Sequence, residues 1–252
     1  MTTLVSIHSF RGGTGKSNTS ANLAALLAQS GKRVAVIDTD VQSPGIHVLF
    51  GFDENLVGRT LNDYLYGACA IEDAAIDVTA RVNNPAPGGA LYLVPSSIKA
   101  GDIAKVLRQG YDVELLNEGF RAISKKLQLD VLLIDTHPGL NEETLLSITI
   151  SDTLLLILRP DKQDYQGTAV TVDIARRLDV PNLLLLVNKV PTNVDLAALA
   201  TEVSGVYGAT VAGVLPLAEA IVTNASGGLF AQTNPDHPWS VTLAGVAAQL
   251  IG

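Results

Sequence analysis

Residues 4–17 read LVSIHSFRGGTGKS, an apolar run followed by a glycine-rich turn that ends in Lys16 and Ser17. The apolar period of residues 18–29, which follow, is that of a helix. Glycines let successive backbone N–H groups turn toward an anion, and a helix N-terminus adds partial positive charge. A lysine here can reach the β and γ phosphates of a nucleotide, and a serine can hold Mg²⁺. The stretch therefore predicts a phosphate cradle made of Gly12, Gly13, Thr14, Gly15, Lys16, Ser17 and Asn18.

Short apolar runs rich in Val, Ile and Leu recur along the chain without polar alternation. Such runs are typical of strands that are covered on both faces of a parallel sheet. Stretches of helical period lie between most of them. The alternation predicts an α/β fold, a doubly wound and mostly parallel sheet with helices on both faces. The expected strands are 4–7, 34–37, 91–94, 131–134, 154–158, 183–187 and 211–215, and the expected helices are 18–29, 114–127, 168–178 and 195–203.

The composition is that of a globular protein. Of the 252 residues, 47% are hydrophobic and 17% are charged, so the chain can bury a sizeable core. Single α/β domains reach about 250 residues, and we expect one domain over residues 1–252. Because Cys69 is the only cysteine, an intrachain disulfide and a cysteine-rich metal site are excluded. A reducing, cytoplasmic setting follows as the ordinary expectation.

Acidic residues follow two further strands, at the edge where parallel sheets bind ligands. Asp38 and Asp40 end one run, and Asp135 ends another. Paired carboxylates beside a triphosphate and a metal position water and bind metal-bound water rather than act as strong bases. A carboxylate at the tip of a buried strand reaches Mg²⁺, usually through water. We therefore predict metal-binding and water-positioning roles here, although an Asx-type turn would explain either member of the pair alone.

Asn188 ends the run at 183–187 and is the candidate residue for reading a base. A side-chain amide can donate to and accept from an adenine edge at once. A guanine-binding protein would be expected to show N-K-x-D, but the third residue after Asn188 is Pro191. This absence favours ATP over GTP.

Together these motifs resemble those of the ParA/MinD family of deviant Walker A ATPases, over almost the full length of the chain. The cradle is similar to the family's K-G-G-x-G-K-S/T, with Phe10 where a standard Walker A loop has its first glycine. Residues 38–45 resemble the switch I loop D-x-D-P-Q, and residues 135–140 resemble the switch II loop. The resemblance implies that Asp40 orients the attacking water and that Asp38 holds the Mg²⁺ shell or assists. It also implies that Pro216 and Leu217 wall the purine.

The resemblance also implies a molecular switch. Members of the family close around two ATP molecules as a sandwich homodimer and hydrolyse them, with Mg²⁺, when an adaptor or activator protein docks. The cycle takes the dimer on and off a membrane or nucleoid surface and so positions a cargo. Arg11 stands where the family has its signature lysine, and this departure favours the carboxysome-distributing McdA group. Plasmid or chromosome partition is the competing role.

The signature lysine reaches across the dimer, and two residues could replace it here. Arg11 keeps the charge, but its planar fork cannot deliver a point charge as an ammonium does, so a cis or structural role is the alternative. Lys162 lies in a loop that the family places at the dimer interface, next to Asp161, whose counterpart approaches the partner's nucleotide. We hypothesise that Lys162 supplies the trans lysine, with a solvated loop lysine as the alternative. His137, in switch II, is interpreted as a loop residue rather than a catalytic base.

The charge distribution limits how such a switch could reach a surface. The net charge is -8, and no Lys or Arg lies after Lys189. Because a lipid-binding amphipathic helix needs basic residues, we expect no direct membrane anchor in residues 240–252. Non-specific DNA binding would require Lys125–Lys126 or Arg176–Arg177 to combine across a dimer, although each pair alone fits a solvated helix face.

Other function classes use a similar loop. Iron-sulfur relatives need paired cysteines, which this chain lacks. A small-molecule enzyme of the dethiobiotin-synthetase kind would use the same carboxylates without a trans lysine. An ATP-binding module without significant hydrolysis would result if Arg11 disables the trans contact.

Overall fold

The computed structural model describes residues 1–53 and 58–251. An eight-stranded sheet has the order β3-β4-β2-β5-β1-β6-β7-β8. Neighbouring strands are parallel except that β3 pairs antiparallel with β4. The strands are β1 (Thr3–His8), β2 (Arg33–Asp38), β3 (Ile76–Asp77), β4 (Ala90–Val94), β5 (Val131–Asp135), β6 (Thr153–Leu158), β7 (Asn182–Val190) and β8 (Thr210–Pro216).

All seven predicted strands are confirmed, as β1, β2 and β4 to β8. The two-residue β3 was not predicted, since so short a segment has no period to detect. The helices are α1 (Lys16–Gln29), α2 (Ile46–Leu49), α3 (Leu61–Leu65), α4 (Ala100–Gln109), α5 (Glu114–Lys126), α6 (Glu142–Ile150), α7 (Lys162–Arg177), α8 (Leu196–Tyr207), α9 (Glu219–Asn224), α10 (Phe230–Thr233) and α11 (Pro238–Gln249). The four predicted helices correspond to α1, α5, α7 and α8.

Helix α7 begins six residues earlier than the sequence predicted. The Asp161 carboxylate accepts hydrogen bonds from the backbone N–H groups of Gln163 and Asp164, at 3.1 and 3.0 Å. A carboxylate in this position satisfies N–H groups that have no partner within the helix. The cap therefore extends the helix through the polar residues that follow Asp161.

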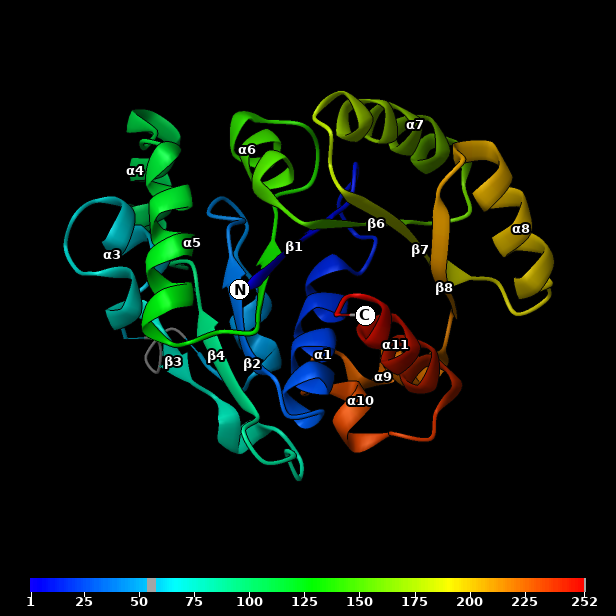
Figure 1. Ribbon diagram of the computed structural model, residues 1–252, viewed down its shortest axis with the longest axis horizontal. Coiled ribbons are helices and arrows are strands. Elements are labelled where there is room, and N and C mark those ends of the chain that lie inside the picture. The colour runs from blue at the N-terminus through cyan, green and yellow to red at the C-terminus, as the bar shows by residue number, and fades with distance from the viewer. Residues whose placement is uncertain (54–57, 252) are drawn as a thin grey trace.

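The two faces of the sheet are covered by different helices, as predicted. Val34 and Val36 of β2 lie in one apolar cluster with α1 and α11, whereas Ala35 and Ile37 lie in another with α5. Side chains of a strand alternate between the faces, so both clusters draw on the same short strand. Figure 1 shows α1 and α11 on one side of the sheet and α5, α6 and α7 on the other.

The helix near the C-terminus belongs to the core. Trp239, Leu243 and Val246 of α11 are buried, and the helix packs against α1 and β8. The apolar side of α11 is therefore covered by protein. Among the described residues, no helix combines the length and the apolar character that crossing a bilayer requires.

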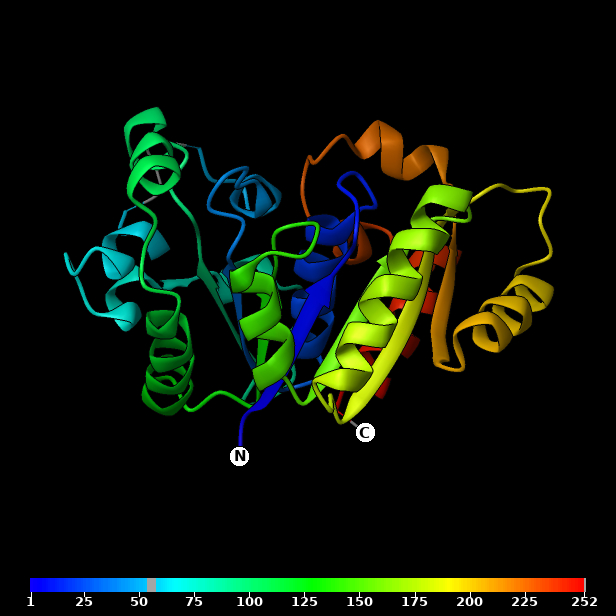
Figure 2. The ribbon, with the colours of Figure 1, turned by 90° about the horizontal axis from the view of Figure 1, so that it is seen from above.

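The parallel strands bring their carboxyl ends to one edge of the sheet. β5 pairs with both β1 and β2, and in these pairs Asp135 is the register partner of Ile7 and of Asp38. Figure 2 shows the loop after β1 and the segment after β8 at this edge, while both termini lie at the opposite edge. The predicted site residues therefore converge, although up to 201 positions separate Gly15 from Pro216 in the sequence.

Candidate functional site

The loop after β1 has the backbone geometry of an anion cradle. Gly13 and Gly15 have φ angles of +77° and +93°, in the left-handed region that favours glycine. A Cβ atom on Gly15 would lie 2.6 Å from the Asn188 side-chain nitrogen, so a larger residue is also excluded by space. Gly15 is the N-cap of α1 and provides no side-chain cap. The N–H groups of the first helical turn are thus directed toward an anion.

Lys16 lies beneath this loop in a buried ion pair. Its Nζ is 3.0 Å from Oδ1 of Asp135, and the two residues are 7% and 0% exposed. Ser20, one turn further along α1, donates a hydrogen bond to the same oxygen at 2.8 Å. The second oxygen of Asp135, Oδ2, is buried and has no hydrogen-bond partner within residues 1–53 and 58–251. A buried carboxylate oxygen in this state is suited to a further ligand, such as a metal-bound water.

Asp38 is held beside Asp135 by the parallel register of β2 and β5. Burial, together with the negative charge of Asp135, raises the pKa of Asp38 to about 7, although Lys16 opposes the shift. The carboxylate of Asp38 accepts hydrogen bonds from the backbone N–H groups of Asp40 and Gly45, at 3.0 and 3.2 Å. Asp38 therefore fixes the start of the following loop as well as adding charge to the site.

Asp40 contacts the loop after β5. Its Oδ1 lies 2.7 Å from Nδ1 of His137 and accepts a hydrogen bond from the backbone N–H of Ser43. The hydrogen bond to Asp40 raises the pKa of His137, although partial burial opposes the shift. The sequence interpretation of His137 as a loop residue did not anticipate this link between the two predicted switch loops.

His8, at the end of β1, is a buried histidine under the same loops. Its Nδ1 lies 2.7 Å from the hydroxyl oxygen of Thr136, and its Nε2 is buried with no partner in the part of the chain that the structure describes. Burial and the nearby Lys16 lower the pKa of His8 to about 3. His8 is therefore neutral at physiological pH, because protonation would place a second cation beside Lys16.

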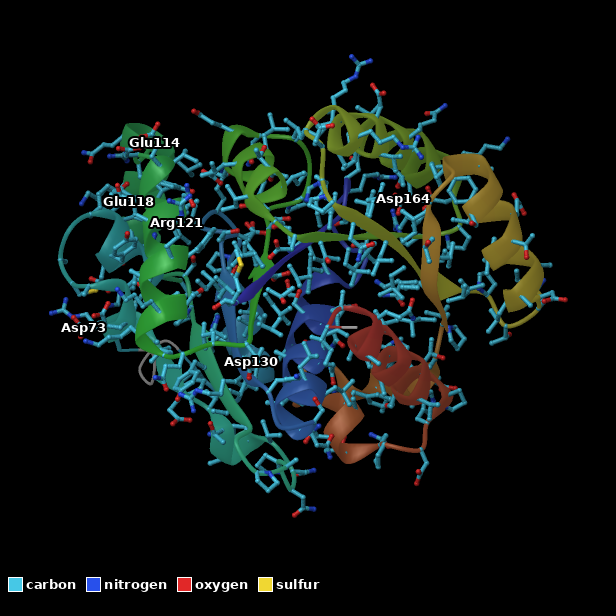
Figure 3. All side chains as sticks on the ribbon, in the orientation of Figure 1. Asp73, Glu114, Glu118, Arg121, Asp130 and Asp164 are labelled. Carbon is cyan, nitrogen blue, oxygen red and sulfur yellow. The ribbon has the colours of Figure 1, made fainter. Side chains whose placement is uncertain are left out.

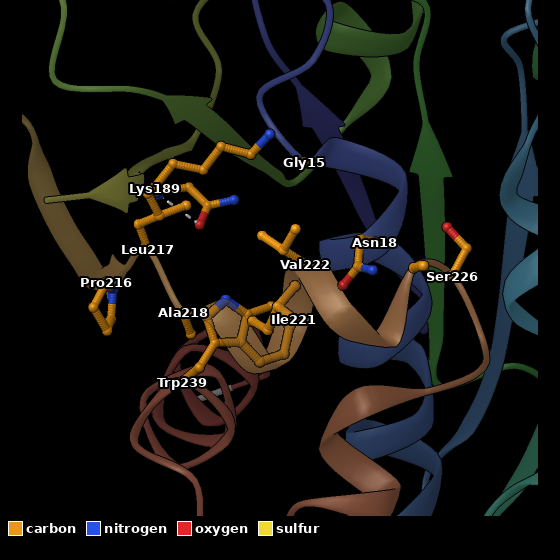
Figure 4. Close-up of a pocket in the computed structure, with 12 residues that line it drawn as sticks. Gly15, Asn18, Lys189, Pro216, Leu217, Ala218, Ile221, Val222, Ser226 and Trp239 are labelled. Carbon is orange, nitrogen blue, oxygen red and sulfur yellow. Dashed lines mark hydrogen bonds between the residues drawn. The ribbon is translucent and has the colours of Figure 1, made fainter.

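Two adjoining cavities occupy this edge. One, of about 390 Å³, is lined by the glycine-rich loop together with Asp40, Ser43, His137 and Pro138. The other, of about 230 Å³, is mostly apolar and lies between the ends of β7 and β8 and helix α9 (Figure 4). Gly15 and Asn18 line both cavities, so the two form one elongated site. The second cavity is lined by Gly15, Asn18, Asn188, Lys189, Pro216, Leu217, Ala218, Ile221, Val222, Ala225, Ser226 and Trp239.

The side-chain amide of Asn188 makes two hydrogen bonds within the protein. Its nitrogen donates to the carbonyl oxygen of Thr14 at 2.8 Å, and its oxygen accepts from the backbone N–H of Lys189 at 2.8 Å. One N–H and one lone pair of the amide are not used by these contacts. The predicted base-reading residue thus also connects β7 to the phosphate loop.

The sequence matches a known family over most of its length. Residues 2–181 match the family described as AAA domain. An uncharacterized ATP-binding protein of Methanocaldococcus jannaschii is 31% identical over 254 residues, which cover 100% of this chain and 89% of that protein. The chain belongs to the AAA domain family.

Solved structures of other proteins share the fold. MinD of Pyrococcus horikoshii, complexed with Mg-ADP, matches with a TM-score of 0.82 and 22% identity, over 99% of this chain and 96% of that chain. Apo McdA from Cyanothece matches with a TM-score of 0.76 and 18% identity, over 100% of both chains. These matches confirm the predicted α/β fold, which this chain shares with MinD and McdA.

In this AAA domain, Arg11 contacts its own chain. Its guanidinium donates to the side chain of Gln163 and lies 3.8 Å from the carboxylate of Asp164, which also binds Arg159. Asp164 lies on the sheet side of α7 (Figure 3). The ring of Phe10 packs against Gly167 of α7, where a Cβ atom would come within 2.0 Å of it. Arg11 and Phe10 therefore attach the loop to α7.

The predicted interface residues at the start of α7 differ in their surroundings. Lys162 is the first residue of the helix and is exposed. Asp161, besides capping the helix, lies 3.4 Å from Arg159. A role for Asp161 in the structure of this chain is thus evident, and its predicted role toward a partner's nucleotide stays a prediction.

Most side chains of the two basic pairs that were candidates for DNA binding already contact other groups of this chain. Arg176 donates to the carbonyl oxygens of Tyr207 and Gly208 at the end of α8. Arg177 is paired with Asp173 at 2.8 Å, and Lys126 lies 3.7 Å from Glu72. Acidic Glu114 and Glu118 share α5 with Arg121, Lys125 and Lys126 (Figure 3). The expected DNA contact therefore stays a prediction.

The donor set fits Mg²⁺ better than a metal caged by protein side chains. Within residues 1–53 and 58–251, no group of three or more His, Cys, Asp or Glu residues is arranged to hold a metal ion. Mg²⁺ usually keeps several waters and takes one or two carboxylates together with substrate phosphates. Ser17 lines the cradle cavity together with Lys16, and Lys16 pairs with Asp135. These residues fit a metal that arrives with a nucleotide.

Sequence reasoning missed Ser20 and Lys189. Ser20 could have been found, because it lies four residues after Lys16 and so on the same side of α1. Lys189 donates from Nζ to the carbonyl oxygen of Gly13 at 2.7 Å. Its position next to Asn188 was visible in the sequence, but the φ of +59° that turns it toward the loop was not.

Proposed function

We propose that residues 1–252 form one Mg²⁺-dependent ATPase domain that hydrolyses ATP to ADP and phosphate. The observation that carries the proposal is the pair Lys16 and Asp135, buried under a glycine-rich helix N-terminus. An unpartnered carboxylate oxygen lies on the same Asp135. A cation, backbone N–H donors and a carboxylate with a free oxygen are what a triphosphate and its metal require.

The residues divide the work along the site. The N–H groups of Gly12 to Asn18 bind phosphate oxygens, and Lys16 exchanges part of its contact with Asp135 for the β and γ phosphates. Ser17 and Asp135 would hold Mg²⁺, and Asp38 would hold its water shell or assist. The ion would supply positive charge against the charge that develops on the phosphates. Asp40 orients the attacking water, and its contact with His137 sets the carboxylate's direction.

The apolar cavity next to the cradle takes the adenine ring. Asn188 has one amide hydrogen and one lone pair available for the base edge, while Pro216 and Leu217 line the wall. Lys16 and the phosphate loop lie at one end of this elongated site, and α9 lies at the other. An ATP molecule would therefore extend from the loop after β1 to the loop after β8.

Dimerisation and cargo positioning are the finer part of the proposal. Lys162 is exposed at the start of α7, which supports a role in reaching a second copy's nucleotide. Arg11 is engaged within its own chain by Gln163 and Asp164, which supports the cis reading of Arg11. The switch would position a carboxysome, plasmid or chromosome with a partner protein. Arg11 at the signature position favours the McdA-like role.

Arg11's contacts within its own chain also favour a second candidate, an ATP-binding module without significant hydrolysis. If Lys162 does not replace the trans lysine, ATP would bind but would not be turned over. An enzyme of the dethiobiotin-synthetase kind would instead turn over a metabolite as a monomer.

The first experiment measures ATP hydrolysis and mass in solution with Mg²⁺, with EDTA, and with a slowly hydrolysed ATP analogue. We expect slow, Mg²⁺-dependent release of phosphate and a shift from monomer to dimer. ATP binding without hydrolysis would favour the binding module. Absence of ATP binding would contradict the proposal.

The second experiment tests Lys162 with the substitution Lys162→Ala. We expect ATP-dependent dimerisation to be lost while the affinity of the monomer for ATP stays within about twofold, because the side chain is exposed and does not line the cradle cavity. Lys99→Ala, at the exposed residue that precedes α4, is the matched control and should dimerise as the wild type does. A dimer that survives Lys162→Ala in size-exclusion chromatography with light scattering would rule out this role.

A further inference from the structure

The end of β7 departs from a regular strand at the point where it meets the phosphate loop. Its register with β8 shifts between Val187 and Val190, and Lys189 has a φ of +59°. A residue other than glycine in the left-handed region is strained and persists only where the surrounding structure holds it. The Asn188 side chain holds this turn by accepting a hydrogen bond from the N–H of Lys189 at 2.8 Å.

This irregular backbone directs two consecutive side chains to the same loop. In a regular strand, neighbouring side chains point to opposite faces of the sheet. Here Asn188 donates to the carbonyl oxygen of Thr14 at 2.8 Å, and Lys189 donates to that of Gly13 at 2.7 Å. Figure 4 shows the Lys189 side chain extending toward the phosphate loop. The two donors therefore hold two consecutive carbonyl groups.

Holding these carbonyls also fixes two N–H groups. A peptide bond is planar and trans, so the C=O of one residue and the N–H of the next point in opposite directions. When Lys189 holds the C=O of Gly13, the N–H of Thr14 points away from β7. When Asn188 holds the C=O of Thr14, the N–H of Gly15 also points away from β7. These two N–H groups belong to the cradle that would bind the phosphates.

We propose that Lys189 is a positioning residue that presets the Gly13–Thr14 peptide so that its N–H faces the phosphate. This inference rests on the proposed function, because it concerns the same nucleotide site. Glycine-flanked peptides rotate easily, so a loop without this contact would have to order its N–H donors when ligand binds. Lys189 acts on the phosphates through the backbone, and it also lines the base cavity.

The test compares Lys189→Met, which keeps the length of the side chain and removes the donor, with Lys189→Arg, which keeps a donor. Calorimetry measures the binding of ATP, inorganic tripolyphosphate and adenosine to each. We expect Lys189→Met to weaken ATP and tripolyphosphate binding about tenfold or more and to leave adenosine binding within about twofold. Lys189→Arg should restore most of the loss. Lys99→Met is the matched control and should bind all three as the wild type does.

Two further measurements separate positioning from simpler effects. Loss of a cation also weakens long-range attraction to phosphate, but that effect is screened by salt, whereas a preset peptide is not. The loss should therefore persist at 0.5 M KCl. Lys189→Gly removes the donor and relieves the strained φ, so it should bind ATP as weakly as Lys189→Met with little change in Tm.

Equal weakening of ATP and adenosine would show that Lys189 only shapes the cavity wall and would overturn the inference. A loss that disappears at 0.5 M KCl would overturn it as well, and so would ATP binding that Lys189→Met leaves unchanged. Absence of ATP binding by the wild-type chain would overturn the proposed function and this inference together.

Discussion

The two ends of the elongated site are built in different ways. The phosphate end consists of charged groups that are buried at the tips of β1, β2 and β5, with Lys16, Asp38 and Asp135 each less than a tenth exposed. The base end consists of two amides, one serine, one lysine and otherwise apolar residues, and in helix α9 no residue is buried. The phosphate end is thus held by interactions in the interior, whereas the base end is held largely by a short surface helix.

Because of this difference, we expect the two ends to contribute differently to folding and to ATP binding. Buried charges are costly unless they are paired, so the phosphate end is stable only with its full set of partners. Apolar walls contribute affinity in proportion to the area that they cover and tolerate small changes. We therefore expect substitutions at the phosphate end to affect folding and binding together, and those at the base end to affect binding alone.

The largest effect is expected from Lys16→Ala. It leaves Asp135 and Asp38 as neighbouring buried carboxylates without their cation, and removal of one partner of a buried pair costs about 3 kcal/mol or more. We expect the free energy of unfolding in urea to fall by about this amount and ATP binding to be lost. Lys99→Ala should change neither. An unchanged unfolding free energy would show that the phosphate end is not held by this pair.

A smaller effect is expected from pH, through His8. The pKa of His8 is about 3 in the folded chain, against 6.5 in the unfolded chain. Below pH 6.5 the unfolded chain takes up a proton that the folded chain does not, so stability falls as the pH falls. From pH 7 to pH 5 this loss is about 2 kcal/mol. Between pH 7 and pH 5, the free energy of unfolding of His8→Asn, measured in urea, should fall by about 2 kcal/mol less than that of the wild type. Parallel curves for the two proteins would contradict the prediction.

The smallest effect is expected at the base end, from Ile221→Ala. The side chain lines the apolar cavity and is only partly buried. Its truncation should weaken ATP binding by about 1 kcal/mol, since a few methyl groups lose their cover. Tripolyphosphate binding should not change. Trp239, the single tryptophan, lines the same cavity, so its fluorescence can follow the binding titration. A loss of tripolyphosphate affinity would mean that the two ends are not independent.

The sequence predicted most of the sheet because its signal is local. Seven strands are continuous apolar runs, which a parallel sheet covered on both faces requires. The site residues could also be predicted from the sequence. The carboxyl ends of such strands share an edge, and Asp38, Asp135 and Asn188 each end a run. The early start of α7 was missed because a single capping side chain, Asp161, extends the helix through polar residues.

The sequence by itself determined the fold class, the phosphate loop and the identity of the carboxylates near it, because each depends on residue type at fixed spacing along the chain. The tertiary structure alone decided how these groups are paired. The residues that contact the Arg11 side chain lie more than 150 positions away, and those that donate to the Asp135 carboxylate lie more than 110 positions away. Which atoms meet over such separations depends on register and on single backbone angles, such as the φ of Lys189, that no local pattern encodes.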